Sequence, residues 1–209
     1  MNNSLDPERA LRAIPAPDSL PDITPAAARD GLLDVAYVIE DTPVGRLLLA
    51  ATPRGLVRVA YLDHSDEDAV LEHLASRVSP RVLSAAKPLD EPRRELEQYF
   101  AGARRKFDTP LDWQLVQGFG RRVLEATARV PFGSLTTYKR VATEAGSPRA
   151  ARAAGNALGA NPIPIIVPCH RVLHSTGGLG GYTGGLERKR LLLGIEGSRP
   201  SEQLALPSD

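Results

Sequence analysis

Residues 161–172 read NPIPIIVPCHRV and contain the only cysteine of the chain, Cys169. The prolines of this stretch restrict the backbone on its approach to the cysteine. The apolar run at 165–167 between them predicts a short, buried, strand-like segment. We therefore expect this stretch to be a rigid part of the core that fixes the position of one thiol.

The pair formed by Cys169 and His170 is a candidate for nucleophilic chemistry. A thiol reacts as the thiolate, and an imidazole can take its proton. Adjacent side chains rarely face each other, so contact between these two requires a bridging water or a bend in the chain. Free cysteine is also common as inert buried filler, so the dipeptide by itself leaves both interpretations open.

A glycine-rich segment follows at 177–186 and reads GGLGGYTGGL. Glycines allow the backbone to approach a ligand closely, while Tyr182 and Thr183 offer a ring and polar groups. The spacing matches neither of the common phosphate-binding glycine motifs. His174, just before this segment, is expected to be an ordinary solvated loop residue.

Three helices are predicted upstream of the cysteine, over 115–128, 136–145 and 147–159. Thr136 is the expected N-cap of the second helix, and a Ser-Pro pair starts the third. Two short helices joined by a tight glycine-containing turn resemble a helix-turn-helix.

The third of these helices carries little bulk, because alanine and glycine occupy most of its positions. Arg149, Arg152 and Asn156 are among the few side chains that project far from it. Such a surface suits close approach to a nucleic acid groove, and it equally suits tight packing inside the protein. The helix alone does not separate these two interpretations.

The N-terminal half has a different texture. Short β-rich runs between turn residues at 34–62 predict three antiparallel strands in a meander. Amphipathic spacing predicts helices over 66–78 and 89–100, and a short helix over 4–14 that prolines terminate. The expected fold class is α+β, organised as a flexible extension (1–30), an N-terminal α/β domain with a small antiparallel sheet (31–113), a helical C-terminal domain (114–197) and a frayed tail (198–209).

Composition excludes several classes of protein. The chain has 209 residues, 42% of them hydrophobic, and a net charge of +1, which excludes histone-like, acidic disordered and collagenous chains. One cysteine excludes an internal disulfide framework and any multi-thiolate zinc or iron–sulfur site. No apolar run reaches the ~18 residues of a membrane span, and no signal-peptide pattern opens the chain. We expect a reducing cytoplasmic setting.

Charge is distributed unevenly along the chain. Residues 1–113 hold 14 Lys/Arg and 19 Asp/Glu, whereas residues 114–197 hold 11 and 4. The two nets are therefore −5 and +7. A basic C-terminal half favours an anionic partner, although a solvated basic face would give the same count.

The box NPIPIIVPCHRV, with GYTGG downstream and a Tyr–Arg helix pair upstream, closely resembles the methylated-DNA–protein-cysteine methyltransferases, also called O6-alkylguanine-DNA alkyltransferases. The resemblance is dense over 119–197, weaker over 34–113, and absent over 1–30 and 198–209. The asparagine eight residues before the cysteine makes the box highly specific.

The resemblance implies a role for each matching residue. Cys169 matches the thiol that accepts the alkyl group, His170 the base that deprotonates it through a water, and Glu196 the acid that orients this base. Tyr138 matches the tyrosine that protonates the departing guanine, and Arg152 the finger that fills the gap left by a flipped nucleotide. The substrate pocket would comprise Asn161, Pro164, Val172, Tyr182 and Thr183, and the DNA-binding surface Arg152, Tyr138, Lys139, Arg140 and Arg149.

The implied activity is direct-reversal DNA repair. A methyl or larger alkyl group would pass from O6-alkylguanine, and also from O4-alkylthymine, to Cys169 after minor-groove binding and base flipping. The thioether product has no leaving group, so each molecule acts once. The resemblance implies a monomer on double-stranded DNA, with no cofactor, metal or membrane.

Two other functions compete with this one. Relatives that bind alkylguanine without repairing it replace the acceptor cysteine, often with tryptophan, so Cys169 argues against a pure binding module. A cysteine hydrolase or a DNA-binding regulator is the other alternative. A hydrolase would turn over many substrates, whereas the transferase is expected to give a one-to-one burst.

Overall fold

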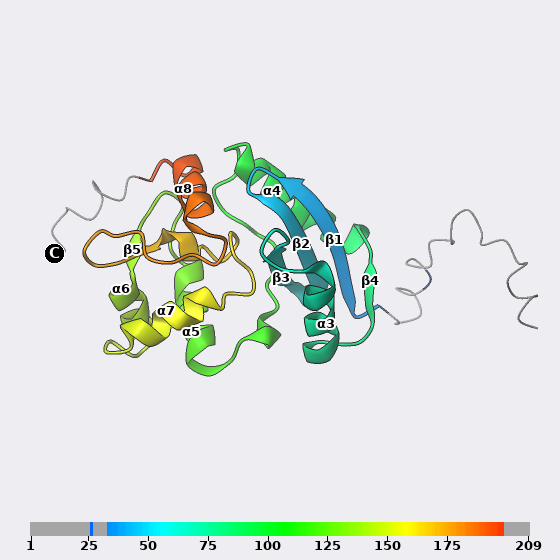
Figure 1. Ribbon diagram of the computed structural model, residues 1–209, viewed down its shortest axis with the longest axis horizontal. Helices are drawn as coiled ribbons and strands as arrows, with labels where there is room; N and C mark the ends of the chain where they lie inside the picture. The colour runs from blue at the N-terminus through cyan, green and yellow to red at the C-terminus, as the bar shows by residue number, and fades with distance from the viewer. Residues whose placement is uncertain (1–25, 27–32, 199–209) are drawn as a thin grey trace, which may run out of the picture.

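A four-stranded sheet forms the first half of the chain in the computed structural model, which describes residue 26 and residues 33–198 (Figure 1). Strands β1 (Val35–Thr42), β2 (Gly45–Thr52) and β3 (Gly55–Tyr61) pair antiparallel, which confirms the predicted meander. A short fourth strand, β4 (Val82–Ser84), lies parallel to β1 at the edge and was not predicted. The expected extension, its helix over 4–14 and all but the first residue of the expected tail lie outside the described residues.

Alternation along β2 separates two cores. Leu47 and Leu49 face one buried cluster, while Leu48 and Ala50 face another, as the two-residue period of a strand requires. Helix α3 (Glu67–Arg77) covers the second cluster. Helix α4 (Asp90–Phe100), preceded by the 3₁₀ turn η1 (Lys87–Leu89), packs against the first. Both predicted helices of this half are confirmed.

The second half of the chain is mainly helical. It contains α5 (Gly118–Ala128), α6 (Tyr138–Glu144), α7 (Ala151–Gly159) and α8 (Leu186–Ile195), with short pieces η2 (Trp113–Leu115), β5 (Thr136–Thr137), η3 (Cys169–Arg171) and β6 (Val172–Leu173) between them. In Figure 1, α5, α6 and α7 lie together on the left and the sheet lies on the right. The fold is α+β, as predicted.

Three details of the predicted helices are wrong. Thr136 lies in β5, and Thr137 caps α6 by accepting a 3.2 Å hydrogen bond from the Arg140 amide. The first helix begins at Gly118 rather than at 115, because η2 ends before it. The third begins at Ala151, since the residues from Ser147 onward form a separate hydrogen-bonded turn.

The run 165–167 is buried as predicted but is not a strand. The amide of Val167 donates to the Ile163 carbonyl over 2.9 Å, which closes a turn, and Ile165 adopts a φ of 75°. Flanking prolines lack the amide hydrogens that a strand would need for pairing. The stretch is therefore a tight buried turn, an unusual conformation for a β-branched residue.

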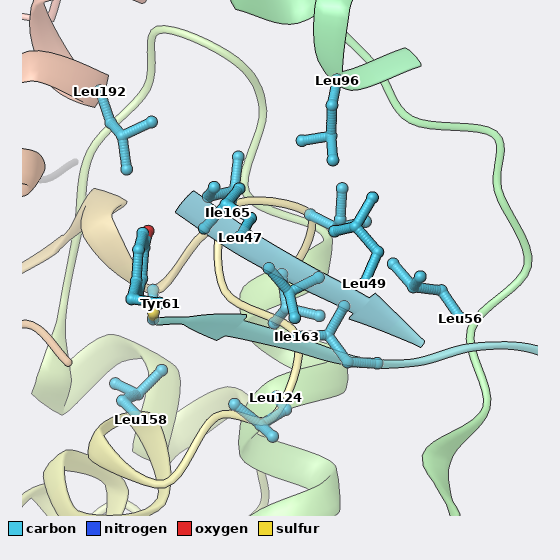
Figure 2. Close-up of a cluster of buried hydrophobic side chains, with 14 of the residues drawn as sticks. Leu47, Leu49, Leu56, Tyr61, Leu96, Leu124, Leu158, Ile163, Ile165 and Leu192 are labelled. Carbon is cyan, nitrogen blue, oxygen red and sulfur yellow. The ribbon is translucent and has the colours of Figure 1, made fainter. Parts of the chain in front are cut away.

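The two halves share one hydrophobic core. Figure 2 shows Leu47, Leu49 and Leu56 of the sheet beside Ile163 and Ile165 of the buried turn. The Val59 amide in β3 also donates to the Pro162 carbonyl over 2.8 Å. The sheet is thus the wall against which the cysteine-bearing turn is set. Among the described residues, no helix is long and apolar enough to cross a membrane.

Candidate active site and DNA-facing surface

The side chain of Asn161 holds the turn that carries the cysteine. Its Oδ1 accepts from the Ile163 amide over 3.0 Å, and its Nδ2 donates to the Val167 carbonyl over 2.9 Å. The same Nδ2 lies 3.3 Å from Sγ of Cys169. One buried amide therefore satisfies the backbone of the turn and also contacts the thiol, and a larger or apolar side chain could not replace it.

Cys169 lies at the start of η3 and is only 5% exposed. Burial raises the pKa of its thiol to about 11, although the hydrogen bond from Asn161 and the charge of Lys189 oppose this rise. The thiol is therefore protonated at neutral pH. It needs a base to become a nucleophile.

His170, the next residue, is fully buried, and its Nε2 lies 2.9 Å from Oε1 of Glu196. Burial lowers the pKa of this histidine, against the opposing effect of Glu196. A carboxylate accepts hydrogen bonds, so Nε2 carries the proton and Nδ1 carries a lone pair. Nδ1 is buried and has no hydrogen-bond partner among the residues that the structure describes. The imidazole is thus neutral and has one unused acceptor.

Glu196, at the end of α8, receives more hydrogen bonds than the sequence suggests. Burial alone would raise its pKa, but the hydrogen bonds from His170 and Arg171 outweigh burial and hold the pKa at about 2. Its donors are His170 Nε2, Tyr99 Oη, Arg171 Nε, Arg171 Nη2 and the Gly133 amide, at 2.8–3.3 Å. The carboxylate is therefore ionised and fixed on both oxygens.

Arg171 and Tyr99 were missed by the sequence analysis. The guanidinium of Arg171 clasps Glu196 through two nitrogens, each at 2.8 Å, and is nearly buried. Its position next to His170 in the box was the available signal. Tyr99 lies 97 residues before its partner Glu196, and no sequence pattern connects them.

Lys189 is a further buried cation that the sequence analysis did not identify. Its Nζ donates to the Val172 carbonyl over 2.7 Å and to the Leu179 carbonyl. Burial lowers its pKa to about 8, while Cys169 acts in the opposite direction. The ammonium therefore joins the backbone after the cysteine to the glycine-rich segment and favours a negative charge on the thiol.

A cavity of about 600 Å³ opens over the thiol. It brings together predicted residues from four parts of the chain: Tyr138, Arg152, Cys169, Tyr182 and Thr183 line it. His174 lines it too, and its ring lies 5.1 Å from that of Tyr138, so it is more than the solvated loop residue that was expected. The predicted pocket residues Asn161, Pro164 and Val172 are buried and are not among its lining residues.

Tyr138 is half-buried at the wall of this cavity. Burial, followed by the nearby Cys169, raises the pKa of its hydroxyl, so it keeps its proton at neutral pH. The opposite side of the cavity mouth is α7, where Ala154 and Leu158 are buried while Arg152 is exposed. Both interpretations of this small-residue helix thus hold, one for each face.

The remaining predicted DNA contacts are exposed cations. Lys139 and Arg140 lie on the first turn of α6, and Arg149 lies in the turn before α7. Arg140 forms an exposed ion pair with Glu144 at 3.2 Å. These side chains lie outside the cavity, on the two helices that line it.

Comparison with known proteins matches both halves of the chain. A family model for the DNA-binding domain of 6-O-methylguanine DNA methyltransferase matches residues 118–198, and one for its ribonuclease-like domain matches residues 35–113. A methylated-DNA–protein-cysteine methyltransferase of Mycolicibacterium paratuberculosis is 37% identical over 172 residues, which cover 82% of this chain and 98% of the relative. The constitutive enzyme of Bacillus subtilis is 35% identical and covers 77% of this chain and 94% of its own.

Solved structures agree with these matches. The O6-methylguanine methyltransferase of Mycobacterium tuberculosis superposes with a TM-score of 0.66 at 36% identity, over 84% of this chain and 96% of that one. A structure of the OGT protein of the same organism in complex with DNA gives a TM-score of 0.66 at 35% identity, over 81% of this chain and 98% of that one.

Proposed function

Because the chain belongs to the methylated-DNA–protein-cysteine methyltransferase family, we propose that Cys169 is its alkyl acceptor and that O6-alkylguanine in duplex DNA is its substrate. The protein repairs DNA by direct reversal, transferring an alkyl group from DNA to a cysteine. The observation that carries the residue assignment is the buried thiol of Cys169, at the floor of a cavity and next to a histidine fixed by a carboxylate.

The first step is deprotonation of the thiol. Nδ1 of His170 takes the proton through a water molecule, and Glu196 stabilises the imidazolium that forms. This arrangement suits a thiol whose pKa is about 11, since the thiolate is generated only when the base acts. Lys189 reduces the cost of the negative charge on sulfur.

The second step is displacement at the alkyl carbon. The sulfur forms a bond with this carbon, and the bond between the carbon and O6 breaks, so that its electron pair passes to the guanine. The Tyr138 hydroxyl supplies a proton to the guanine ring as it departs. The product is a thioether and a restored guanine. No group on the enzyme can reverse the thioether, so each molecule reacts once.

DNA must present the base outside the duplex, because a stacked guanine cannot reach a buried thiol. We place α7 in the minor groove, where its small side chains permit close approach. Arg152, which is exposed at the cavity mouth, enters the stack at the vacated position. Lys139, Arg140 and Arg149 contact phosphates, which gives affinity without sequence selection.

Two finer assignments complete the proposal. O4-alkylthymine is a second substrate, because its alkyl oxygen occupies a comparable position on a smaller base. The protein acts as a monomer in the cytoplasm: one chain supplies all the residues that we assign to the reaction, and a reducing compartment keeps Cys169 as a free thiol.

A titration tests this proposal. Increasing amounts of duplex DNA with O6-methylguanine are added to a fixed amount of protein, and repaired guanine is measured. We expect repair to stop at one equivalent per protein molecule, and Cys169→Ala to abolish it while duplex binding persists. Repair that continues over many equivalents would indicate a hydrolase instead, and binding without repair would indicate a recognition module.

A further inference from the structure

We propose that Tyr61, on the sheet-bearing half of the protein, is a positioning residue for the alkyl-transfer site. It holds the ring of Tyr182 in place and thereby limits the size of alkyl group that the cavity accepts. This inference rests on the proposed function of Cys169, and it gives the N-terminal half a direct part in substrate selection.

The two tyrosines form a hydroxyl pair across the boundary between the halves. Oη of Tyr61 lies 2.7 Å from Oη of Tyr182, with the rings edge to face and their centroids 6.2 Å apart. Tyr61, at the end of β3, is 3% exposed (Figure 2). Tyr182 lines the cavity together with Cys169. A buried hydroxyl on the sheet is thus bonded directly to a wall of the substrate cavity.

Backbone packing leaves this pair little freedom. A Cβ placed on Gly184 would come within 2.7 Å of Cε2 of Tyr61 and 2.9 Å of Cε1 of Tyr182. Both rings therefore rest against the same glycine, in the segment 177–186 that the sequence analysis singled out. The ring of Tyr182 also lies edge-on to that of His170, at 6.3 Å between centroids.

Arg188, on the first turn of α8, fixes Tyr61 from the other side. Its guanidinium lies 4.8 Å from the centre of the Tyr61 ring and donates to the Gly184 carbonyl over 3.1 Å. It also donates to the Val44 carbonyl and forms an ion pair with Asp63. One arginine therefore joins the β1–β2 turn, the end of β3 and the glycine-rich segment.

Chemistry explains why a tyrosine is needed at position 61. Burial raises the pKa values of both hydroxyls, so both stay protonated, and each can satisfy the other. Without the Tyr61 hydroxyl, the Tyr182 hydroxyl would lose this partner, and its ring would be free to rotate away from the thiol. The cavity would then widen and accept a bulkier group more readily.

Tyr61→Phe tests this inference, because it removes the hydroxyl and keeps the ring under Arg188. Single-turnover rate constants are measured with duplexes that carry O6-methylguanine or O6-benzylguanine. We expect the benzyl-to-methyl ratio to rise about fivefold, the equivalent of one hydrogen bond. Tyr37→Phe is the matched control, since Tyr37 packs against the other core cluster, and we expect it to leave the ratio unchanged.

A second variant keeps the test decisive if the first is unstable. Tyr182→Phe removes the other hydroxyl of the pair and should raise the ratio similarly, and the double variant should raise it no further. An unchanged or lower ratio in folded Tyr61→Phe, or an equal rise in Tyr37→Phe, would overturn the inference. Wild-type protein that transfers neither group would instead refute the proposed function itself.

Discussion

The hydroxyl of Tyr99 donates a 2.8 Å hydrogen bond to Oε1 of Glu196, the same oxygen that lies 2.9 Å from Nε2 of His170. Tyr99 belongs to α4, in the sheet-bearing half, and Glu196 to the end of α8. The carboxylate that orients the base is therefore held from both halves of the chain. The N-terminal half reaches the reaction site here as well as at Tyr61.

We predict that Tyr99→Phe lowers both stability and the transfer rate. The substitution leaves the ring volume unchanged and removes one of the donors to a buried carboxylate, which costs about 2 kcal/mol of unfolding free energy. His170 is then less firmly oriented, and transfer slows severalfold. Urea unfolding and single-turnover kinetics measure the two effects, with Tyr37→Phe as the control. A fully active, fully stable variant would contradict this role of Tyr99.

The pH dependence of transfer is predicted from the base. Because the pKa of His170 is lowered by burial, the imidazole stays neutral at and above its ordinary pKa of 6.5. With DNA saturating, the rate constant should be flat between about pH 6.5 and 8 and fall only at lower pH. A thiol with a pKa of about 11 acting without a base would instead speed up about tenfold per pH unit over that range.

Gly180→Ala is expected to slow transfer through Tyr138. Gly180 has a φ of 66°, and a Cβ there would lie 2.5 Å from the Tyr138 hydroxyl, so the proton donor must move. We expect a loss of at least about tenfold in rate. Gly177→Ala is the matched control: its φ is 86°, yet its Cβ would meet nothing within 4 Å. Equal losses in both variants would mean that backbone strain alone is responsible.

The salt dependence of DNA binding tests the proposed phosphate contacts. Lys139→Ala and Arg149→Ala should each reduce the slope of log K against log salt by about 0.9, the value of one released counterion. Arg77→Ala, an exposed residue of α3, should leave the slope unchanged. Unchanged slopes in the first two variants would place the DNA on another surface.

Much of the fold could be predicted because local patterns carry it. Alternation in the meander and amphipathic spacing in α3 and α4 report burial directly. The edge strand β4 has three residues, too few for a period to emerge. The left-handed Ile165 could not be foreseen, because its conformation is imposed by the Asn161 hydrogen bonds and the shared core rather than by its own preference.

The site could be predicted only in part. Contiguous residues gave the box around Cys169 and His170, and the family resemblance added Glu196, Tyr138 and Arg152. Their catalytic and DNA-binding roles stay predictions, which the variants above test. Contacts made by side chains far apart in sequence leave no local signature, so Tyr99, Tyr61 and Lys189 emerged only once the chain was folded.

The most direct test of the central claim is the mass of the peptide that contains Cys169 after reaction with duplex DNA carrying O6-methylguanine. The thioether predicts an increase of about 14 Da on this one residue, with fragment ions that locate it on sulfur. It should appear in proportion to the guanine repaired. Repair with an unmodified Cys169 peptide, or with the added mass on another residue, would contradict the account.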